Sequence, residues 1–587
     1  MISHDGLNYT IWYVLYSTWI GLTCYFVFKV LMEMSWSRRH AQAVEFRKQK
    51  CVESFAVFRQ RVAESNIDED LVEEILSLEF PQLRRALQCG KYTPTQVHLA
   101  YADVIGKINV TYNCVAECIV ESFDMVKSLE EKYKDSDEKP YLYGVPFSVK
   151  SNFYLKGHDC CIGLSKFLDE KKNDTCTFVE VLMRLGGIPI CITNVPQGLM
   201  SFVCSNPIFG TTQNPHKDGF TPGGSSGGEA CLVARKGIPF GIGSDLAGSL
   251  RIPAHMSGVV SLKPSELRFA VYHTHGGMPG KARIGLSNGF FTRSVDEQIE
   301  LLDVLLNSDH YQTLRPAHSV IQKFDMAPAD RQFEKGLKIG YYTHNGFIQP
   351  VPACSRAVLE VVNRIKGPHK VTEFAVPDPT RMAWIVLSNI ASDGFEYWRE
   401  IFANEKLDPY MKQFVFTIKI PRFIKRILSC VLSSICPELA LMCRTGVYSA
   451  GEVRRLFEDT DLYKEQFFKA WNEADLDALI VPAFPVTAVP HSYPQKLGVV
   501  AVETALYNVL DCPAGVVPVT KVTSDDIAKL TNDKEFPVGW NLTRKLMMES
   551  GLKTEGLPVG VQIVTKPYEE EKCLRIMKEI ERIMKDQ

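Results

Sequence analysis

The chain has 587 residues, which allows several domains or one large one and is enough to bury a sizeable hydrophobic core. Its 66 basic residues nearly balance its 68 acidic residues, and 45% of its residues are hydrophobic. These values are ordinary for a globular protein and exclude a mainly disordered chain or one that coats nucleic acid. The 17 cysteines lack paired spacing, apart from the adjacent Cys160 and Cys161, which favours reduced thiols and a body that faces the cytosol.

An uncharged run of 20 residues, Tyr9 to Phe28, lies near the start and has about the length that crosses a hydrocarbon core. Asp5 precedes the run, and basic residues follow it at Lys29, Arg38, Arg39, Arg47, Lys48 and Lys50. A signal peptide has the opposite charge order, and the positive-inside rule places the rest of such a chain in the cytosol. We therefore expect residues 1–30 to be a transmembrane anchor. A surface or buried helix is the alternative, because tyrosine, tryptophan, serine and threonine make the run weakly hydrophobic.

Residues 31–95 are predicted to form a helical segment, because apolar residues recur three and four positions apart from about residue 47 onward. From about residue 140, short β-rich runs alternate with helical patterns. The pattern predicts a strand over Tyr143 to Val149, a helix over Phe178 to Arg184 and a strand over Ile188 to Ile192. Such alternation is typical of an α/β fold around a sheet.

The densest signal lies between Thr221 and Pro253, in TPGGSSGGEACLVARKGIPFGIGSDLAGSLRIP. Crowded glycines let backbone N–H groups converge on an anionic ligand. The segment lacks the Gly-Lys-Ser/Thr of a P-loop and the Gly-x-Gly-x-x-Gly of a dinucleotide site, so it implies no nucleotide. Gly-x-Ser-x-Gly occurs twice, but the turn-rich NPHKDGFTP before it is unlike the strand that precedes a nucleophile elbow of α/β hydrolases.

Read together with Lys150 in YGVPFSVK, this segment resembles the amidase signature family, whose pattern runs from Gly-Gly-Ser-Ser-Gly-Gly through Ser/Thr-Asp-x-Gly-Gly-Ser-x-Arg-x-Pro. TNVPQ at Thr193 to Gln197 and LPVGVQIV at Leu557 to Val564 are further landmarks. The resemblance covers roughly residues 70–580. Within the family, the N-terminal run and NVLDCPAGVVPVT, from Asn508 to Thr520, are most similar to the membrane-bound fatty acid amide hydrolases.

This resemblance implies an amidase-signature α/β fold, in which helices cover both faces of a central twisted mixed β-sheet. The catalytic domain would span residues 96–587 and follow an N-terminal transmembrane helix. The implied activity is hydrolysis of long-chain fatty acid amides, both N-acylethanolamines and primary fatty amides, to a fatty acid and an amine.

The resemblance also implies a catalytic triad of Lys150, Ser225 and Ser249. A serine hydroxyl needs a base, and no histidine lies in these blocks, so a desolvated lysine with a lowered pKa is the available one. Ser249 would attack the carbonyl and form an acyl-enzyme. Ser225 would pass the proton between Lys150 and the leaving amine.

Other site residues follow from family position. The backbone N–H groups of Leu246, Ala247, Gly248 and Ser249 are expected to form the oxyanion hole. Leu199 and Phe202 are expected to line the acyl pocket. A second set of residues is expected to hold the loops in shape through hydrogen bonds: Ser226, Asp245 and Arg251.

One position departs from close relatives, which usually carry Gly-Gly before the nucleophile where this chain has Ala247-Gly248. An alanine disfavours positive φ by about 1 to 2 kcal/mol. A left-handed backbone at Ala247 would therefore be strained, and we expect a strained loop to slow turnover. This residue is the one feature that favours the alternative of a catalytically weak or inactive amidase-fold membrane protein that binds lipid amides.

The stretch from Met411 to Met442 is apolar but too often interrupted by lysine and arginine to span a membrane. Pro421 and Pro437 divide it into two pieces, and we expect a pair of basic amphipathic helices whose apolar face enters the headgroup boundary and whose cations contact phosphates. A core helix hairpin is the alternative. By resemblance, residues 411–442 form a membrane-binding cap that admits lipid amides.

We expect no metal and no organic cofactor, because His273 and His275 have no third ligand at metal-binding spacing. The expected partners are a lipid amide substrate, membrane lipids and, by resemblance, a second copy in a homodimer, but no nucleic acid. The expected location is an internal membrane, the endoplasmic reticulum, with the catalytic domain in the cytosol. Soluble amidases of small amides and glutaminase-type subunits of the transamidosome are the rival enzyme classes, and the anchor and cap argue against both.

Overall fold

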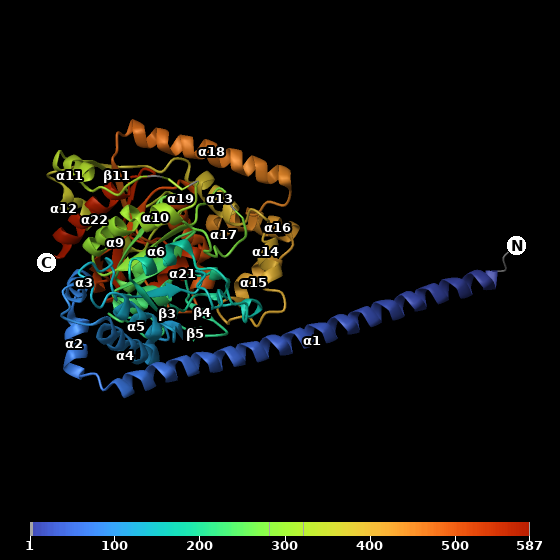
Figure 1. Cartoon of the computed structure of the whole chain (residues 1–587). Coiled ribbons are helices and arrows are strands. Elements are labelled where there is room, and N and C mark those ends of the chain that lie inside the picture. Colours follow the sequence, from blue (N-terminus) through green and yellow to red (C-terminus); the bar gives the residue numbers. More distant parts are fainter. Residues whose placement is uncertain (1–3, 281, 318, 321, 586–587) are drawn as a thin grey trace.

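The computed structural model describes residues 4–280, 282–317, 319–320 and 322–585 (Figure 1). Within these residues, one sheet has eleven strands in the order β1-β3-β2-β6-β8-β7-β12-β13-β11-β9-β10. Its strands are β1 (Val115–Cys118), β2 (Pro146–Lys150), β3 (Ile188–Thr193), β6 (Phe240–Asp245), β7 (Val260–Lys263), β8 (Ser287–Thr292), β9 (Lys338–Tyr341), β10 (Lys370–Glu373), β11 (Ala478–Pro482), β12 (Ala514–Lys521) and β13 (Pro558–Thr565). A separate short pair consists of β4 (Ser205–Asn206) and β5 (Gly210–Thr211).

The sheet is mixed. β2 runs parallel to its neighbours β3 and β6, whereas neighbouring strands from β6 across to β11 pair antiparallel. β9 and β10 then continue parallel to β11. The α/β fold with a large mixed sheet flanked by helices, which the sequence predicts, is confirmed.

Helices flank the sheet and form the outer shell of the body (Figure 1). In the amino-terminal half they are α1 (His4–Ser65), α2 (Glu69–Ser77), α3 (Phe80–Gln88), α4 (Pro94–Tyr112), α5 (Ser122–Lys132), α6 (Thr177–Arg184), α7 (Gly227–Ala234), α8 (Arg251–Ser257) and α9 (Val295–Asn307). The others are α10 (Asp309–Leu314), α11 (Ala327–Glu334), α12 (Pro352–Ile365), α13 (Pro379–Ile390), α14 (Glu396–Ile401), α15 (Lys412–Lys419), α16 (Arg422–Leu432), α17 (Pro437–Arg444), α18 (Ala450–Glu473), α19 (Val502–Val509), α20 (Ser524–Leu530), α21 (Leu542–Gly551) and α22 (Glu570–Lys585).

The local sequence explains where α4 begins and ends. Thr93 and Gln96 form a reciprocal capping box, and Pro94 occupies the first turn, where its missing N–H costs no hydrogen bond. The helix ends at Tyr112 and is capped by Asn113, which adopts a left-handed conformation with φ of 49°. α4 then leads into β1, which pairs with β3 beside the strand that carries Lys150.

The sequence locates the early elements closely. The helix predicted over Phe178 to Arg184 is α6, and the strand predicted over Ile188 to Ile192 is β3. The strand predicted over Tyr143 to Val149 is β2, but it begins only at Pro146, because a turn with Gly144 at φ of 73° precedes it. The NPHKDGFTP segment contains no strand, as predicted.

α1 is a single helix that continues through residue 30 without a break. Its C-terminal part packs on the body through buried Val44, Cys51 and Phe58, and the Phe58 ring lies 5.0 Å from that of Phe123. Its N-terminal part projects away from the body (Figure 1). Among the described residues, none of the helices combines the length and the apolar composition that crossing a bilayer requires.

The stretch from Met411 to Met442 contains α15, α16 and most of α17, so the prediction of a helix pair is wrong. Pro421 is the N-cap of α16, and Pro437 is the first residue of α17. Both prolines therefore lie where a helix starts. α16 turns its apolar side outward, with Phe423, Ile427 and Val431 each more than 60% exposed.

The polar side of α16 is buried. The Lys425 ammonium lies 5.1 Å from the centre of the Phe395 ring, and the Ser429 hydroxyl accepts a hydrogen bond from Arg444 and donates one to the carbonyl of Ala440. The expectation that every cation of this stretch faces phosphate is therefore wrong for Lys425. This arrangement is the reverse of an ordinary surface helix.

Candidate active site

The candidate site forms where two parallel strands end. β2 and β6 are neighbours, Lys150 is the last residue of β2, and Asp245 is the last residue of β6. The carboxyl ends of parallel strands meet at one edge of a sheet, where the following loops can converge. Ser225 lies just before α7, after a cis peptide bond from Gly224, and Ser249 lies in the loop that joins β6 to α8.

Three sequence-predicted residues meet at this edge. The Lys150 Nζ atom lies 2.9 Å from Ser225 Oγ, and Ser225 Oγ lies 2.9 Å from Ser249 Oγ. Lys150 is fully buried and Ser225 is 3% exposed, whereas Ser249 is only partly buried. A hydroxyl can both donate and accept, so the series provides a continuous proton path with its outer end accessible.

Burial changes the acid–base chemistry of Lys150. Desolvation lowers the pKa of its ammonium to about 7, against the opposing influence of Asp245, Glu229 and Cys204. Its Nζ atom also donates to Ser244, at 3.1 Å to the hydroxyl and 3.3 Å to the backbone carbonyl. A neutral amine in this position can use its lone pair toward Ser225 and its N–H groups toward Ser244.

Asp245 and Arg251 form a fully buried ion pair beneath the Ser249 loop. Arg251 donates from Nη2 to Asp245 Oδ1 at 2.9 Å and from Nε to Oδ2 at 3.0 Å. Asp245 also accepts backbone N–H bonds from Gly248 at 2.7 Å and Leu250 at 3.0 Å. Burial by itself raises the pKa of Asp245, but the Arg251 guanidinium holds that pKa well below its usual range. These contacts fix the loop that carries Ser249.

Residues far along the chain complete the support for this loop. Arg251 donates to the Thr504 carbonyl at 2.6 Å, to Gln562 Oε1 at 2.8 Å and to Asn508 Oδ1 at 2.5 Å. Asn508 in turn donates to the Asp245 side chain at 3.0 Å. The sequence motifs did not predict a role for these three residues. Asn508 and Gln562 do lie in the two C-terminal landmarks, which is the signal that could have indicated them.

The loop before the nucleophile is not strained at Ala247. Positive φ occurs at Gly248, at 126°, and Ala247 is absent from the described residues with positive φ. A Cβ atom on Gly248 would lie 2.4 Å from Thr504 Oγ1, whose hydroxyl donates to the Ala247 carbonyl at 2.6 Å. Glycine is thus required at 248 but not at 247. The expectation of strain at Ala247 is wrong, and the feature that favoured an inactive protein disappears with it.

Of the four expected oxyanion donors, the Gly248 N–H is already engaged by Asp245. Within the described part of the chain, the backbone N–H groups of Leu246, Ala247 and Ser249 have no hydrogen-bond acceptor. Three of the four expected N–H groups are therefore available to a substrate.

The Ser226 side chain fits beside Gly243 because that residue has no side chain. Its hydroxyl donates to the Ser244 carbonyl at 3.4 Å, and a Cβ atom on Gly243 would lie 2.9 Å from its Oγ. Asn152 braces Ser244 from the other side, with Nδ2 at 2.8 Å from Ser244 Oγ. Ser244 and Asn152, which the sequence motifs did not predict, therefore hold the Nζ end of Lys150 in place.

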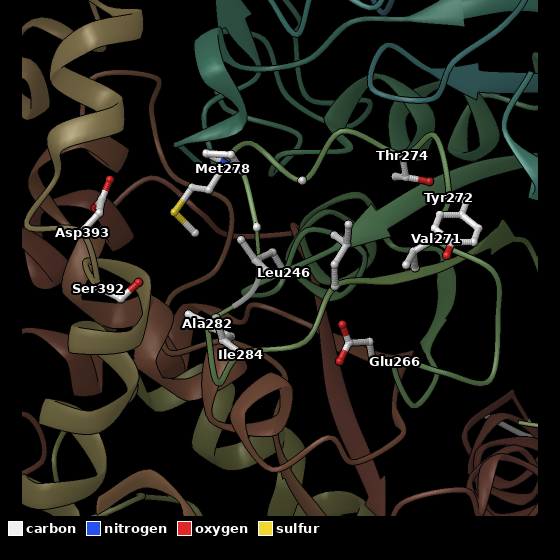
Figure 2. Close-up of a pocket in the computed structure, with 14 residues that line it drawn as sticks. Leu246, Glu266, Val271, Tyr272, Thr274, Met278, Ala282, Ile284, Ser392 and Asp393 are labelled. Carbon is white, nitrogen blue, oxygen red and sulfur yellow. The ribbon is translucent and has the colours of Figure 1, made fainter. Parts of the chain in front are cut away.

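A cavity of about 410 Å³ adjoins the Ser249 loop and includes Leu246 in its lining. Figure 2 shows Leu246 in the middle of this lining, with Ser392 and Asp393 to one side and Glu266 to the other. The loop that carries His273 and His275 continues into the cavity wall at Met278. His275 Nδ1 accepts the Gly277 N–H at 3.0 Å, which fits the expected loop role.

The two residues expected in the acyl pocket lie in different apolar clusters. Leu199 packs with Trp398, Phe402 and Val415, a cluster that reaches into α14 and α15. Phe202 packs in the main core, with its ring 5.3 Å from that of Phe484. The structure therefore places Leu199, but not Phe202, beside the helices of the expected cap.

Comparison with known proteins gives a consistent result. The family model described as Amidase matches residues 96–574. Fatty acid amide hydrolase 1 of Caenorhabditis elegans is 35% identical over 535 residues, covering 89% of this chain and 91% of that protein. Fatty-acid amide hydrolase 1 of Sus scrofa is 32% identical over 573 residues, covering 96% of each. A solved fatty acid amide hydrolase is 21% identical and shares the fold, with a TM-score of 0.75 over 93% of this chain and 95% of that one.

Replacing Lys150 by methionine should stabilise the protein at neutral pH. The folded-state pKa of about 7 lies below the ~10.4 of a lysine in an unfolded chain. Between these pH values the unfolded chain binds more protons, so the stability of the wild type rises with pH. Lys150→Met removes this penalty, and its melting temperature should exceed that of the wild type at pH 7 by an amount that shrinks toward pH 10.

Thermal melts at both pH values measure this difference. Lys534→Met, at an exposed lysine, is the matched control and should show no such pH-dependent gain. A melting-temperature difference that is the same at pH 7 and pH 10 for Lys150→Met would show that the buried amine is not held neutral.

Proposed function

Because this chain belongs to the amidase family, we propose that it is a serine hydrolase that cleaves long-chain fatty acid amides, with Ser249 as nucleophile. The observation that carries the proposal is the unbroken series from buried Lys150 through Ser225 to the accessible Ser249. Relatives named fatty acid amide hydrolase, 35% and 32% identical over most of their length, support the substrate class. N-acylethanolamines and primary fatty amides are the proposed substrates.

Acylation begins when neutral Lys150 accepts the Ser225 proton and Ser225 accepts that of Ser249. Ser249 Oγ then attacks the amide carbonyl. The negative charge that develops on the carbonyl oxygen would meet the free N–H groups of the loop, principally those of Leu246, Ala247 and Ser249. Each such donor can contribute about 10²- to 10³-fold to the rate.

Collapse of the tetrahedral intermediate requires a proton on the leaving nitrogen, because an amide anion is a very poor leaving group. Ser225 delivers this proton, and the Lys150 ammonium returns one to Ser225. The amine departs and the acyl group remains on Ser249 as an ester. Water then repeats the sequence, with its proton passing to the same relay, and releases the fatty acid.

The apolar environment beside the site supports a long acyl chain. Leu199 joins the cluster that contains Trp398, Phe402 and Val415, and Met278 belongs both to this cluster and to the cavity wall. This continuity brings the apolar interior under α14 and α15 next to the loop that carries Ser249. An acyl chain lying there would place its carbonyl at the nucleophile.

The same helices support attachment to a lipid surface. The outward side of α16 exposes Phe423, Ile427 and Val431, and α15 adds Phe416, which is 68% exposed. Exposed apolar side chains on one face of a helix are typical of a segment that enters the headgroup boundary. Lys412, Lys419 and Arg426 are exposed beside them and are able to meet anionic phosphates.

We extend the proposal to the chain as a whole. Residues 1–30 would be a single-pass anchor, residues 31–95 a helical connection, and residues 96–587 the catalytic domain with its cap at 411–442. The uncharged run and the basic residues after it support an orientation with the catalytic domain in the cytosol. An endoplasmic reticulum location and a homodimer complete the proposal.

Ser249→Ala should abolish hydrolysis of oleamide, by at least about a thousandfold, because the Ser249 hydroxyl forms the accessible end of the relay. The variant should melt within a few degrees of the wild type, since Ser249 lies in a partly exposed loop. A fluorophosphonate probe should label the wild type and an exposed-serine control, Ser77→Ala, but not Ser249→Ala. Retained turnover in Ser249→Ala would move the nucleophile elsewhere.

Deleting residues 1–30 should leave the protein bound to phosphatidylcholine vesicles that contain phosphatidylserine, because the α16 face still adsorbs. Adding Ile427→Ser and Val431→Ser should weaken partition by about a hundredfold or more, since each apolar side chain contributes about 1.5 to 3 kcal/mol when buried. Vesicle flotation measures this. Leu462→Ser, on the exposed side of α18, is the control. Release by the deletion alone would refute adsorption by the cap.

A further inference from the structure

Besides Asp245, a second buried acidic residue, Glu229, acts electrostatically on Lys150, the base of the proposed relay. It stands on the first turn of α7, four residues after Ser225, and its side chain is fully buried. Buried carboxyl groups require partners, because an isolated charge in a protein interior is very unfavourable. The reaction steps described above do not use this group.

The sheet provides a fitted site for the Glu229 carboxyl group. The Ser148 hydroxyl donates to Oε2 at 2.5 Å, and the Thr193 hydroxyl donates to Oε1 at 2.7 Å. Space for the carboxyl group comes from Gly241 of β6, where a Cβ atom would lie 1.9 Å from Oε2. The carboxyl group is thus held by side chains of β2 and β3, in space that Gly241 of β6 leaves open.

Both hydroxyl donors are tied to the position of Lys150. Ser148 lies two residues before Lys150 in β2, so the two side chains point to the same face of the sheet. Thr193 is the register partner of Lys150 across the parallel β2 and β3 pair. A rigid Glu229 therefore fixes the two strands and the helix that position the amine and its partner Ser225.

Glu229 also acts on Lys150 through charge. Asp245 forms an ion pair with the Arg251 guanidinium. Glu229 has no such pair among the residues that the structure describes, and the positive charge that favours its carboxylate is that of Lys150. Three other titratable groups face this pair: Asp245 of β6, Cys204 before β4 and Cys191 of β3. Burial raises the pKa of both cysteine thiols, so they stay neutral near pH 7.

Burial and hydrogen bonding act on Glu229 in opposite directions. Burial raises the pKa of its carboxyl group, whereas the two hydroxyl donors and Lys150 favour the carboxylate. Ser148 and Thr193 each donate to a different carboxyl oxygen, and this arrangement suits the ionised form, which only accepts. An ionised Glu229 in turn favours the ammonium form of Lys150, whose pKa burial lowers to about 7.

We propose that Glu229 is a positioning residue that acts through Lys150, holding the amine toward Ser225 and compensating the positive charge that Lys150 acquires when it accepts the relay proton. Glu229 exchanges no proton with the substrate. The inference rests on the proposed Lys150, Ser225 and Ser249 hydrolysis.

The test is the pH dependence of kcat/KM for oleamide in the full-length protein. Glu229→Gln keeps the shape of the side chain and removes its charge, so the ammonium of Lys150 loses its compensation. The acid limb of the profile should move to lower pH by roughly one unit, and kcat should fall by roughly ten- to a hundredfold, with KM little changed. Glu229→Asp retains the charge and should lose kcat while its acid limb stays near that of the wild type.

Glu297→Gln is the matched control, because Glu297 is another buried glutamate, bound to backbone N–H groups at the start of α9. Its acid limb should coincide with that of the wild type. An unmoved acid limb in Glu229→Gln would overturn the inference and leave Glu229 as a packing residue.

Thr193→Val carries the test if Glu229→Gln does not fold. It keeps Glu229 but removes one donor to the carboxylate, so it should move the acid limb in the same direction by a smaller amount, and an unmoved limb would again overturn the inference. Failure of the proposed function is distinct, because then the wild type itself would not hydrolyse oleamide.

Discussion

Removing a lysine side chain from water is expensive, and this fold removes Lys150 from water completely at the end of β2. The free energy spent there lowers the pKa of the amine to about 7, which makes it a base near neutral pH. Two serines extend this base to the surface, because Ser225 is buried beside it and Ser249 is partly exposed beyond. Ser244 accepts hydrogen bonds from the same amine and is held by Asn152, while Glu229 acts on the amine through its charge. The site is thus built around one desolvated lysine.

A second buried basic residue, Arg251, has the opposite role, because it keeps its charge and pairs with Asp245. Asp245 accepts from its guanidinium and from two backbone N–H groups of the Ser249 loop, so the ion pair acts as the frame of that loop. Breaking such a pair typically costs 3 to 5 kcal/mol, because one charge is left uncompensated. The frame also determines where glycine is needed: at Gly248, which packs against Thr504, and not at Ala247.

The sequence was sufficient for the α/β fold and for the residues that meet at the strand ends, because Lys150, Ser225 and Ser249 lie in motifs with fixed spacing. It could not supply Thr504, Asn508 and Gln562, whose contacts with Arg251 depend on how distant segments pack. The backbone conformation at Ala247 could not be predicted either, because the sequence does not say which of two neighbouring residues adopts positive φ. In the cap, hydropathy located the amphipathic stretch but not the burial of Lys425, which depends on the Phe395 ring packed behind α16.

The central claim is that neutral Lys150 takes and returns the relay proton, and a pH–rate profile on a matched oleoyl amide and ester tests it most directly. With the wild type, kcat/KM for the amide should rise with pH through about 7, the pKa to which burial lowers Lys150. Lys150→Ala should lose this rise and lose more activity on the amide than on the ester, because an amine must leave protonated and an alkoxide need not. Parallel profiles and equal losses on both substrates would contradict the account and leave Lys150 a structural residue.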